Sequence, residues 1–240
     1  MFPHPPAPMR AALDALVAAD PRLAVIEAQA GPLPWRTRPR GFAGLLQAIT
    51  AQQISNQAAS AIWRRVTALP GAMTPAGLLA LPEAALRGAG LSRPKVAHAA
   101  SLARAYLDGR LDDAAIDALE DEAALEAITA VPGLGPWTAE VYLLFALQRR
   151  DVFPAGDIAV AGAAAALLGL ASRPDVKTLR GIAEAWRPSR ALAARLLWHH
   201  WRHLTGRPSM DEIALPGGVG GADAEDRGAA RPDHEGQQPL

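Results

Sequence analysis

The chain has 240 residues, half of them hydrophobic, which is enough for one or two domains with a sizeable buried core. Its 24 basic and 24 acidic residues cancel, which excludes a strong overall field for attracting nucleic acid, so any such role must rest on local sites. Residues 211–240 hold seven acidic and two basic side chains, which leaves 22 basic and 17 acidic residues, a net charge of +5, in residues 1–210. The absence of cysteine excludes disulfides, cysteine nucleophiles and cysteine-bound iron–sulfur clusters.

Apolar residues recur at helical spacing in ten segments separated by proline and glycine, and no stretch alternates as a half-buried strand would. The segments are 9–28, 42–69, 75–88, 95–107, 113–118, 122–130, 137–148, 158–170, 176–186 and 189–204. We therefore predict an all-α protein of about ten short helices. No apolar stretch reaches the ~20 residues of a membrane span, and the first residues lack the pattern of a secretory signal. We expect no membrane association.

The segment 42–69 is interrupted by a short polar turn, Gln52–Asn56, between two helical halves. On local grounds this is an amide-rich turn in which Ser55 caps the second helix. A later helix starts near Gly90-Leu91-Ser92-Arg93-Pro94-Lys95, where Lys95 is equally well explained as an ordinary lysine of a first helical turn.

The segment Val131-Pro132-Gly133-Leu134-Gly135-Pro136-Trp137-Thr138 joins two helical segments. Two glycines at a spacing of two let the backbone turn tightly and approach a ligand closely. Glycine N–H groups followed by a helix N-terminus form an anion site that suits a DNA phosphate. An ordinary turn between two helices would use the same residues, so spacing alone leaves both readings open.

A second turn, Asp151-Val152-Phe153-Pro154-Ala155-Gly156-Asp157, leads into an alanine-rich helix that begins at Asp157. Aspartate is a preferred N-cap residue, and this alone would explain it. Asp151 precedes the turn, and we interpret it as structural. Towards the end of the helical region, Trp186, Trp198 and Trp201 could be core residues or could line a pocket. His199 and His203 lie four residues apart but lack an acidic partner for a metal site.

Together these motifs resemble the HhH-GPD superfamily of DNA glycosylases, over about residues 40–205. Three segments match in the family's order and spacing: the Gln-Gln turn at 49–59, the V-P-G-L-G-P-W-T-A hairpin at 131–139 and the D-V-F-P-A-G-D segment at 151–157. The W-R-P-S-R sequence at 186–190 with Trp198 resembles the alkylpurine branch.

The resemblance implies a two-lobed helical fold. A single catalytic unit would span residues 1–214, with one lobe built from 1–45 and about 155–210. The other lobe would span about 46–154 and contain the helix-hairpin-helix at 128–140. Residues 215–240, rich in Gly, Pro and acidic residues, are expected to form a disordered tail.

The resemblance also implies roles for individual residues. Asp157 would be the catalytic carboxylate. DNA would be contacted by the hairpin residues Gly133, Gly135 and Thr138, by an intercalating Gln53 with Ile54 beside it, and by Lys95. The base pocket would contain Trp137, Trp198 and Tyr142, although Tyr142 is offset by one from the family's aromatic position. The carbonyls of Thr129, Val131 and Leu134 would bind a monovalent cation, Na⁺ or K⁺. No other cofactor and no iron–sulfur cluster is expected.

Position 137 departs from the bifunctional relatives, which carry a lysine there that forms a Schiff base with the sugar. A tryptophan has no amine for this step, so we predict a glycosylase without lyase activity. A cationic base such as 3-methyladenine or 7-methylguanine is a good leaving group, so a carboxylate that stabilises the sugar cation is sufficient. We therefore expect a cytoplasmic, nucleoid-associated monomer that removes alkylated purines from duplex DNA. Alternatives are action on other damaged or mismatched bases, and a non-catalytic DNA-binding module in which Asp157 is only a cap.

Overall fold

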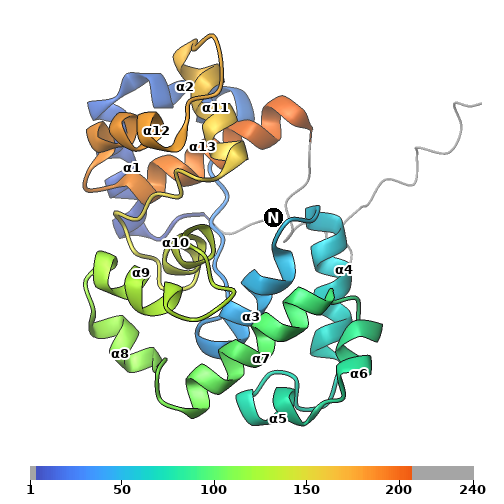
Figure 1. The fold of residues 1–240 in the computed structure, drawn as a ribbon. Helices are drawn as coiled ribbons and strands as arrows, with labels where there is room; N and C mark the ends of the chain where they lie inside the picture. The colour runs from blue at the N-terminus through green and yellow to red at the C-terminus, as the bar shows by residue number, and fades with distance from the viewer. Residues whose placement is uncertain (1–3, 207–240) are drawn as a thin grey trace, which may run out of the picture.

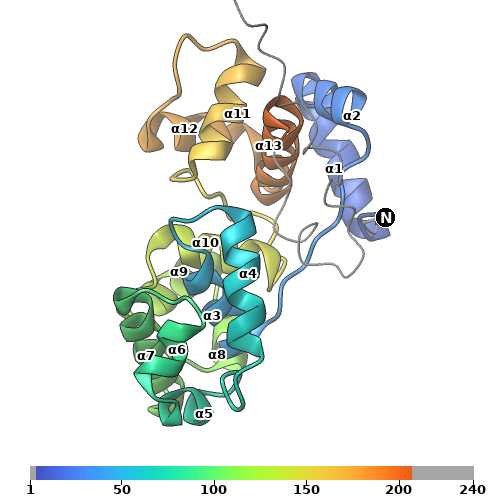
Figure 2. The same ribbon diagram turned by 90° about the vertical axis from the view of Figure 1, so that its right-hand side faces the viewer.

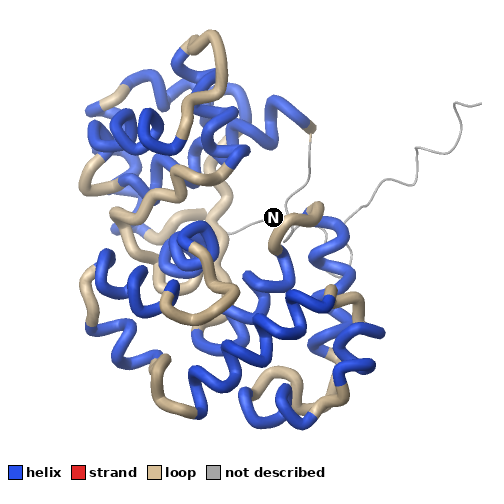
Figure 3. Tube along the Cα trace, viewed as in Figure 1, coloured by secondary structure: helices blue, strands red, loops and turns tan. Residues whose placement is uncertain are grey.

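The computed structural model describes residues 4–206, and the expected tail at 215–240 lies outside them. Within the described range the protein consists of helices and loops with no strand, which confirms the predicted all-α class (Figures 1 and 3). The helices gather in two groups, one above the other in Figure 1, with α10 between them.

The first group, which we call the hairpin lobe, is a continuous run of eight helices. They are α3 (Gly41–Ala51), α4 (Asn56–Thr67), α5 (Pro75–Ala80), α6 (Glu83–Gly88), α7 (Arg93–Leu107), α8 (Asp113–Ala118), α9 (Asp121–Thr129) and α10 (Pro136–Phe145). Their apolar faces meet in one buried core around Leu45, Ile49, Leu102, Ile128 and Leu143.

The second group, the aspartate lobe, combines both ends of the described chain. Its helices are α1 (Ala7–Ala19), α2 (Ala24–Ala30), α11 (Ile158–Leu168), α12 (Val176–Ala183) and α13 (Arg190–Thr205). A separate core contains Leu13, Ile26, Trp186 and Leu196. The extended segment 31–40 connects α2 to α3, and Figure 2 shows it running down one side of the molecule from one lobe to the other.

The segment 9–28, expected as one helix, is broken at Asp20. Asp20 ends α1 and accepts a hydrogen bond from the Arg22 backbone N–H, which starts a short 3₁₀ turn at Pro21–Leu23 before α2. Its other carboxylate oxygen accepts from the buried Trp186 indole at 2.9 Å. The break therefore places a carboxylate where the first and last parts of the lobe pack together.

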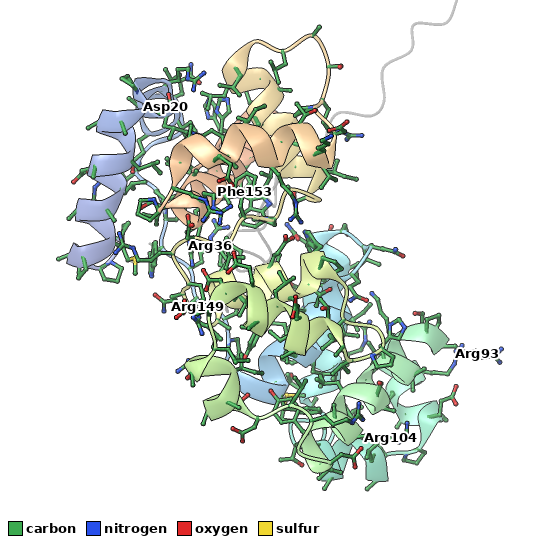
Figure 4. The ribbon with its side chains drawn as sticks, turned by 60° about the vertical axis from the view of Figure 1, so that its left-hand side comes forward. Asp20, Arg36, Arg93, Arg104, Arg149 and Phe153 are labelled. Carbon is green, nitrogen blue, oxygen red and sulfur yellow. The ribbon has the colours of Figure 1, made fainter. Side chains whose placement is uncertain are left out.

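Helix α10 lies at the junction of the two lobes, because neighbouring residues on it enter different cores. Leu143 is buried in the core of the hairpin lobe and Leu144 in that of the aspartate lobe. Arg195 of α13 donates to the carbonyls of Leu144, at 2.9 Å, and Arg36, at 2.8 Å. Figure 4 shows Arg36 beside this junction. These bonds hold the C-terminal end of α10 against α13.

Candidate functional site

Asp157 is the N-cap of α11 and is half-buried. One carboxylate oxygen, Oδ1, accepts from the backbone N–H groups of Ala159 at 2.8 Å and Val160 at 3.0 Å. The other oxygen, Oδ2, accepts from the indole Nε1 of Trp137 at 2.8 Å. Capping therefore uses one oxygen, while the second is directed at the start of α10 in the other lobe. A plain cap would not require this second contact.

Trp137 comes directly after the hairpin, in the first turn of α10, and is half-buried. Its indole N–H joins the hairpin to the carboxylate across the lobe junction. The sequence pattern identifies both residues but does not predict this hydrogen bond. The bond fixes the orientation of Asp157 relative to the glycine turn.

The hairpin turn is tight, and Gly133 is required for two physical reasons. Its φ of +94° lies in the region that L side chains rarely adopt. A Cβ added there would lie 2.2 Å from the His98 ring of α7. At Gly135, the N-cap of α10, a Cβ would meet no heavy atom within 4 Å, so open space faces this backbone. The turn is thus packed on one side and open on the other.

The Gln-Gln turn lies next to the hairpin. The Gln52 side chain donates through Nε2 to the Gly133 carbonyl at 3.0 Å and to Thr138 Oγ1 at 2.9 Å. Gln53 is exposed and has a φ of +56°, uncommon for a residue with a side chain. Ile54 is 38% exposed. The structure therefore presents Gln53 and Ile54 to solvent and directs Gln52 inward.

Lys95 lies in the first turn of α7, and its ammonium donates to the Thr50 carbonyl at 2.7 Å. Burial lowers the pKa of this ammonium. In this conformation Lys95 supports the end of α3 just before the Gln-Gln turn. The ammonium would therefore have to share its N–H groups between the Thr50 carbonyl and any phosphate that it binds.

Two of the aromatic residues expected in the pocket differ in burial: Trp198 is partly exposed, whereas Tyr142 is enclosed in a core. Trp198 is partly buried, and its ring centroid lies 5.3 Å from that of Phe145 at the lobe junction. Tyr142 is only 2% exposed in the hairpin-lobe core, and its hydroxyl accepts from the Gly41 backbone N–H at 2.8 Å. Because its ring is enclosed and its polar end is satisfied, Tyr142 is structural, and we do not retain it as a pocket residue.

Other candidates from the sequence are also structural. Asp151 accepts from the side chains of Arg187 and Arg190, which supports its interpretation as structural. A Cβ on Gly162 would lie 2.5 Å from Trp201, so this tryptophan packs where α11 and α13 approach closely. His199 bonds to the Gly31 carbonyl. Within residues 4–206, no group of three His, Cys, Asp or Glu side chains is arranged to hold a metal ion.

Glu140, three residues after Trp137 on α10, is a buried carboxyl that was not among the residues expected from the sequence. Its side chain is 5% exposed and accepts from Arg180 of α12 at 3.2 Å. Burial raises the pKa of this carboxyl to about 7, the charge of Arg180 opposes the shift, and the charge of Asp157 adds to it. A charge at i+3 from Trp137 on an apolar helix was the available signal. Its partner, 40 positions away, could not be identified from sequence.

None of the helices formed by residues 4–206 has the length and apolarity that crossing a membrane would need.

Residues 46–188 match the HhH-GPD superfamily of base excision DNA repair proteins. DNA-3-methyladenine glycosylase 1 of Schizosaccharomyces pombe is 30% identical over 158 residues, which cover 64% of this chain and 69% of that protein. The structure of S. pombe 3-methyladenine DNA glycosylase Mag1 with abasic DNA superposes with a TM-score of 0.72 at 27% identity, covering 80% of this chain and 95% of that one. A DNA-3-methyladenine glycosidase from Bacillus halodurans gives a TM-score of 0.69 at 33% identity, covering 84% and 94%.

Proposed function

The chain belongs to the HhH-GPD superfamily of base excision DNA repair proteins, and on that premise we propose that it is a monofunctional DNA glycosylase that releases alkylated purines from double-stranded DNA. The observation that carries the proposal is the hydrogen bond from Trp137 to Asp157. It links a carboxylate to Trp137, two residues after Gly135 of the glycine hairpin. In this proposal the sugar of a nucleotide held by the hairpin lies beside that carboxylate.

In this proposal the hairpin holds one DNA phosphate. Gly133, Gly135 and the N-terminus of α10 offer backbone N–H groups, and the helix dipole favours an anion there. The target nucleotide leaves the base stack, because its glycosidic bond cannot be reached inside a duplex. Gln53 and Ile54, the exposed pair of the Gln-Gln turn, fill the space that the base leaves.

Asp157 then acts on the sugar. Cleavage of the glycosidic bond leaves positive charge on the sugar. A fixed carboxylate stabilises this charge and can also orient a water molecule towards the sugar. Trp137 and Trp198 supply aromatic faces for an electron-poor, cationic base. The base departs with the bonding electron pair. Water adds to the sugar cation and gives up a proton, for which the Asp157 carboxylate is the acceptor, and the products are the free base and an abasic site.

Strand cleavage through a Schiff base would need an amine at the sugar. Position 137 offers an indole whose N–H is bound to Asp157, and the Lys95 ammonium is bound to the Thr50 carbonyl. This supports hydrolysis of the base without lyase activity.

A monovalent cation at the hairpin is compatible with the donors present. The candidate ligands, the carbonyls of Thr129, Val131 and Leu134, are neutral oxygens that suit Na⁺ or K⁺. The Val131 carbonyl already accepts from the Leu134 N–H at 3.0 Å, and its second lone pair would serve the ion. Such an ion would add positive charge next to the bound phosphate.

Asp157→Asn tests the proposal. Asparagine also caps helices, so the fold should persist. We expect release of 3-methyladenine and 7-methylguanine from alkylated duplex, measured by chromatography, to fall at least about 100-fold. Affinity for a duplex with an abasic analogue should change less than about threefold, because hairpin contacts supply it.

A matched control is Asp175→Asn. Asp175 caps α12 through the Thr178 N–H at 2.7 Å, and the groups that lower the pKa of its carboxyl, Thr178 and Lys177, belong to the same helix. Unchanged release in Asp157→Asn would contradict the catalytic role of Asp157, and absence of base release by the wild-type protein would favour the non-catalytic DNA-binding alternative. Release of oxidised or mismatched bases instead of alkylated purines would favour the second glycosylase alternative. Nicking of the product strand without alkali would contradict the absence of lyase activity.

A further inference from the structure

The Gln52 side chain connects the Gln-Gln turn to the hairpin, which lies more than 80 residues later in the sequence. Its single side-chain amide nitrogen, Nε2, reaches both the Gly133 carbonyl and Thr138 Oγ1. A primary amide has two N–H groups, so one is available for each acceptor. One acceptor lies in the hairpin turn and the other in the first turn of α10. Both bonds of Gln52 therefore form only when the hairpin turn and the start of α10 lie in the right positions relative to the Gln52 amide.

The backbone around Gln52 is held on both sides. Before it, the Lys95 ammonium binds the Thr50 carbonyl, and after it, Ser55 caps α4 through the Ala58 N–H. Between these anchors Gln53 adopts its positive φ and is exposed. A conformation of this cost persists only when its surroundings impose it. The Gln52 amide is the contact through which the hairpin contributes to that restraint.

We propose that Gln52 is a positioning residue that couples the grip of the hairpin on DNA to the projection of Gln53 and Ile54. The inference rests on the proposed function of these two segments. A phosphate bound at the hairpin would order Gly133 and the start of α10, whose carbonyl and hydroxyl oxygens hold the Gln52 amide. Bound DNA would therefore strengthen the restraint that these two bonds already place on the adjacent turn, in the conformation from which Gln53 and Ile54 project.

The adjacent glutamines thus have separate tasks. Gln53 is exposed and is the side chain available to enter a duplex. The Gln52 amide, by contrast, donates both of its hydrogen bonds to acceptors within the protein. If Gln52 were the intercalating side chain, it would have to give up both bonds when DNA binds. The two assignments predict different consequences for weakening these bonds from the hairpin side.

Two variants weaken the connection from its opposite ends. Gln52→Met keeps the length of the side chain and removes the amide. Thr138→Val keeps the shape of a fully packed residue and removes the Oγ1 acceptor. Gln29→Met is the matched control, because Gln29 is an exposed glutamine on α2 in the aspartate lobe. Thermal unfolding and circular dichroism establish that each variant is folded.

The duplex probe carries a tetrahydrofuran abasic analogue with 2-aminopurine beside it, so fluorescence reports unstacking without any chemical step. We expect Gln52→Met to reduce the unstacking equilibrium about tenfold, the effect of losing one or two hydrogen bonds. Affinity for an undamaged duplex should stay within about threefold of wild type, since phosphate contacts supply it. Thr138→Val should lower unstacking by a smaller factor. The double variant should be no worse than Gln52→Met, because both remove one connection.

Normal unstacking in Gln52→Met overturns the proposal, and so does a parallel loss of unstacking and duplex affinity. The proposal is also overturned if the double variant loses unstacking by the product of the two single-variant factors. It is overturned as well if Thr138→Val unstacks like wild type while Gln52→Met is defective, since that result would assign intercalation to Gln52. If Gln52→Met does not fold, Thr138→Val alone must show the selective loss. The proposed function fails separately: a wild-type protein that releases no base from alkylated DNA refutes the glycosylase assignment, while the fluorescence result still decides the coupling.

Discussion

At the residue scale, Asp157 combines two tasks that local sequence reasoning treats as competitors. Its Oδ1 caps α11 and its Oδ2 binds Trp137. Because separate oxygens are used, the cap does not reduce the availability of the carboxylate but holds it in place. The aspartate could be predicted from the family motif, whereas the direction of its second oxygen depends on a tryptophan 20 positions earlier, and no local pattern encodes that contact.

Trp137→Phe should lower the single-turnover rate of base release about tenfold, because it removes one charge-assisted hydrogen bond to Asp157 and retains an aromatic face. The rate is measured at saturating enzyme, so that DNA affinity does not enter. Trp63→Phe, at a partly buried position in the hairpin lobe, controls for the loss of indole volume. An unchanged rate in Trp137→Phe would mean that the ring matters only as a stacking surface.

Glu140→Gln should alter how stability depends on pH. The pKa of Glu140 is raised in the folded protein from 4.5 to about 7, chiefly by burial, so the folded state holds this proton more tightly than the unfolded state does. The contribution of Glu140 to wild-type stability should therefore fall as pH rises from 4.5 through about 7, and the loss should persist above that. Glutamine does not titrate, so the variant should gain up to about 3 kcal/mol relative to wild type across this range.

Denaturant unfolding at several pH values between about 4.5 and 8 measures this difference, since that window brackets the shift. The exposed Glu126 provides a control, and Glu126→Gln should follow the wild type. If the curves of wild type and Glu140→Gln run parallel, then Arg180 compensates fully for the burial of the carboxylate.

At the scale of elements, periodicity located the helices because most of them bury one apolar face. It missed breaks that depend on single residues. The expected helix 75–88 ends at Ala80 and restarts at Glu83, because Pro82 holds Leu81 in an extended conformation. Here the signal was present in the sequence. The links from Gln52 to the hairpin and from Glu140 to Arg180 had no such signal, since no local pattern encodes which helices pack together.

Gly133→Ala should destabilise the protein by about 1–3 kcal/mol, from its positive φ and from the collision with His98. Gly135 has a negative φ, and a Cβ there would meet open space. Gly135→Ala should therefore leave the unfolding midpoint near that of wild type. Chemical denaturation of the two variants compares a packed glycine with an open one two residues away. Equal midpoints would show that the hairpin relaxes around a Cβ without cost.

At the scale of the whole molecule, the site exists only because two separately packed lobes meet along α10. The hairpin that starts α10 and the aspartate that starts α11 belong to different cores, and the hydrogen bond between Trp137 and Asp157 spans them. The C-terminal end of α10 is tied to the aspartate lobe as well. The relative placement of the lobes should therefore control catalysis at a distance from the reacting atoms.

Arg195 is the residue best placed to test this. Its guanidinium donates to the Leu144 and Arg36 carbonyls and lies over the rings of Trp35, at 4.1 Å, and Phe145, at 4.5 Å. Lysine keeps the charge but cannot bridge two carbonyls while stacking on two rings. Arg195→Lys should cost about 2–4 kcal/mol of stability, measured by denaturant unfolding.

The same variant should slow base release beyond what its folded fraction explains, because α10 carries Trp137 and would shift relative to Asp157. Single-turnover rates, taken at a temperature where circular dichroism shows the variant to be folded, separate the two effects. Arg104→Lys is the control, since Arg104 is exposed on α7, far from the junction in Figure 4. If Arg195→Lys unfolds earlier but releases bases at the wild-type rate, the hydrogen bond between Trp137 and Asp157 alone aligns the lobes, and α10 does not transmit changes from its far end.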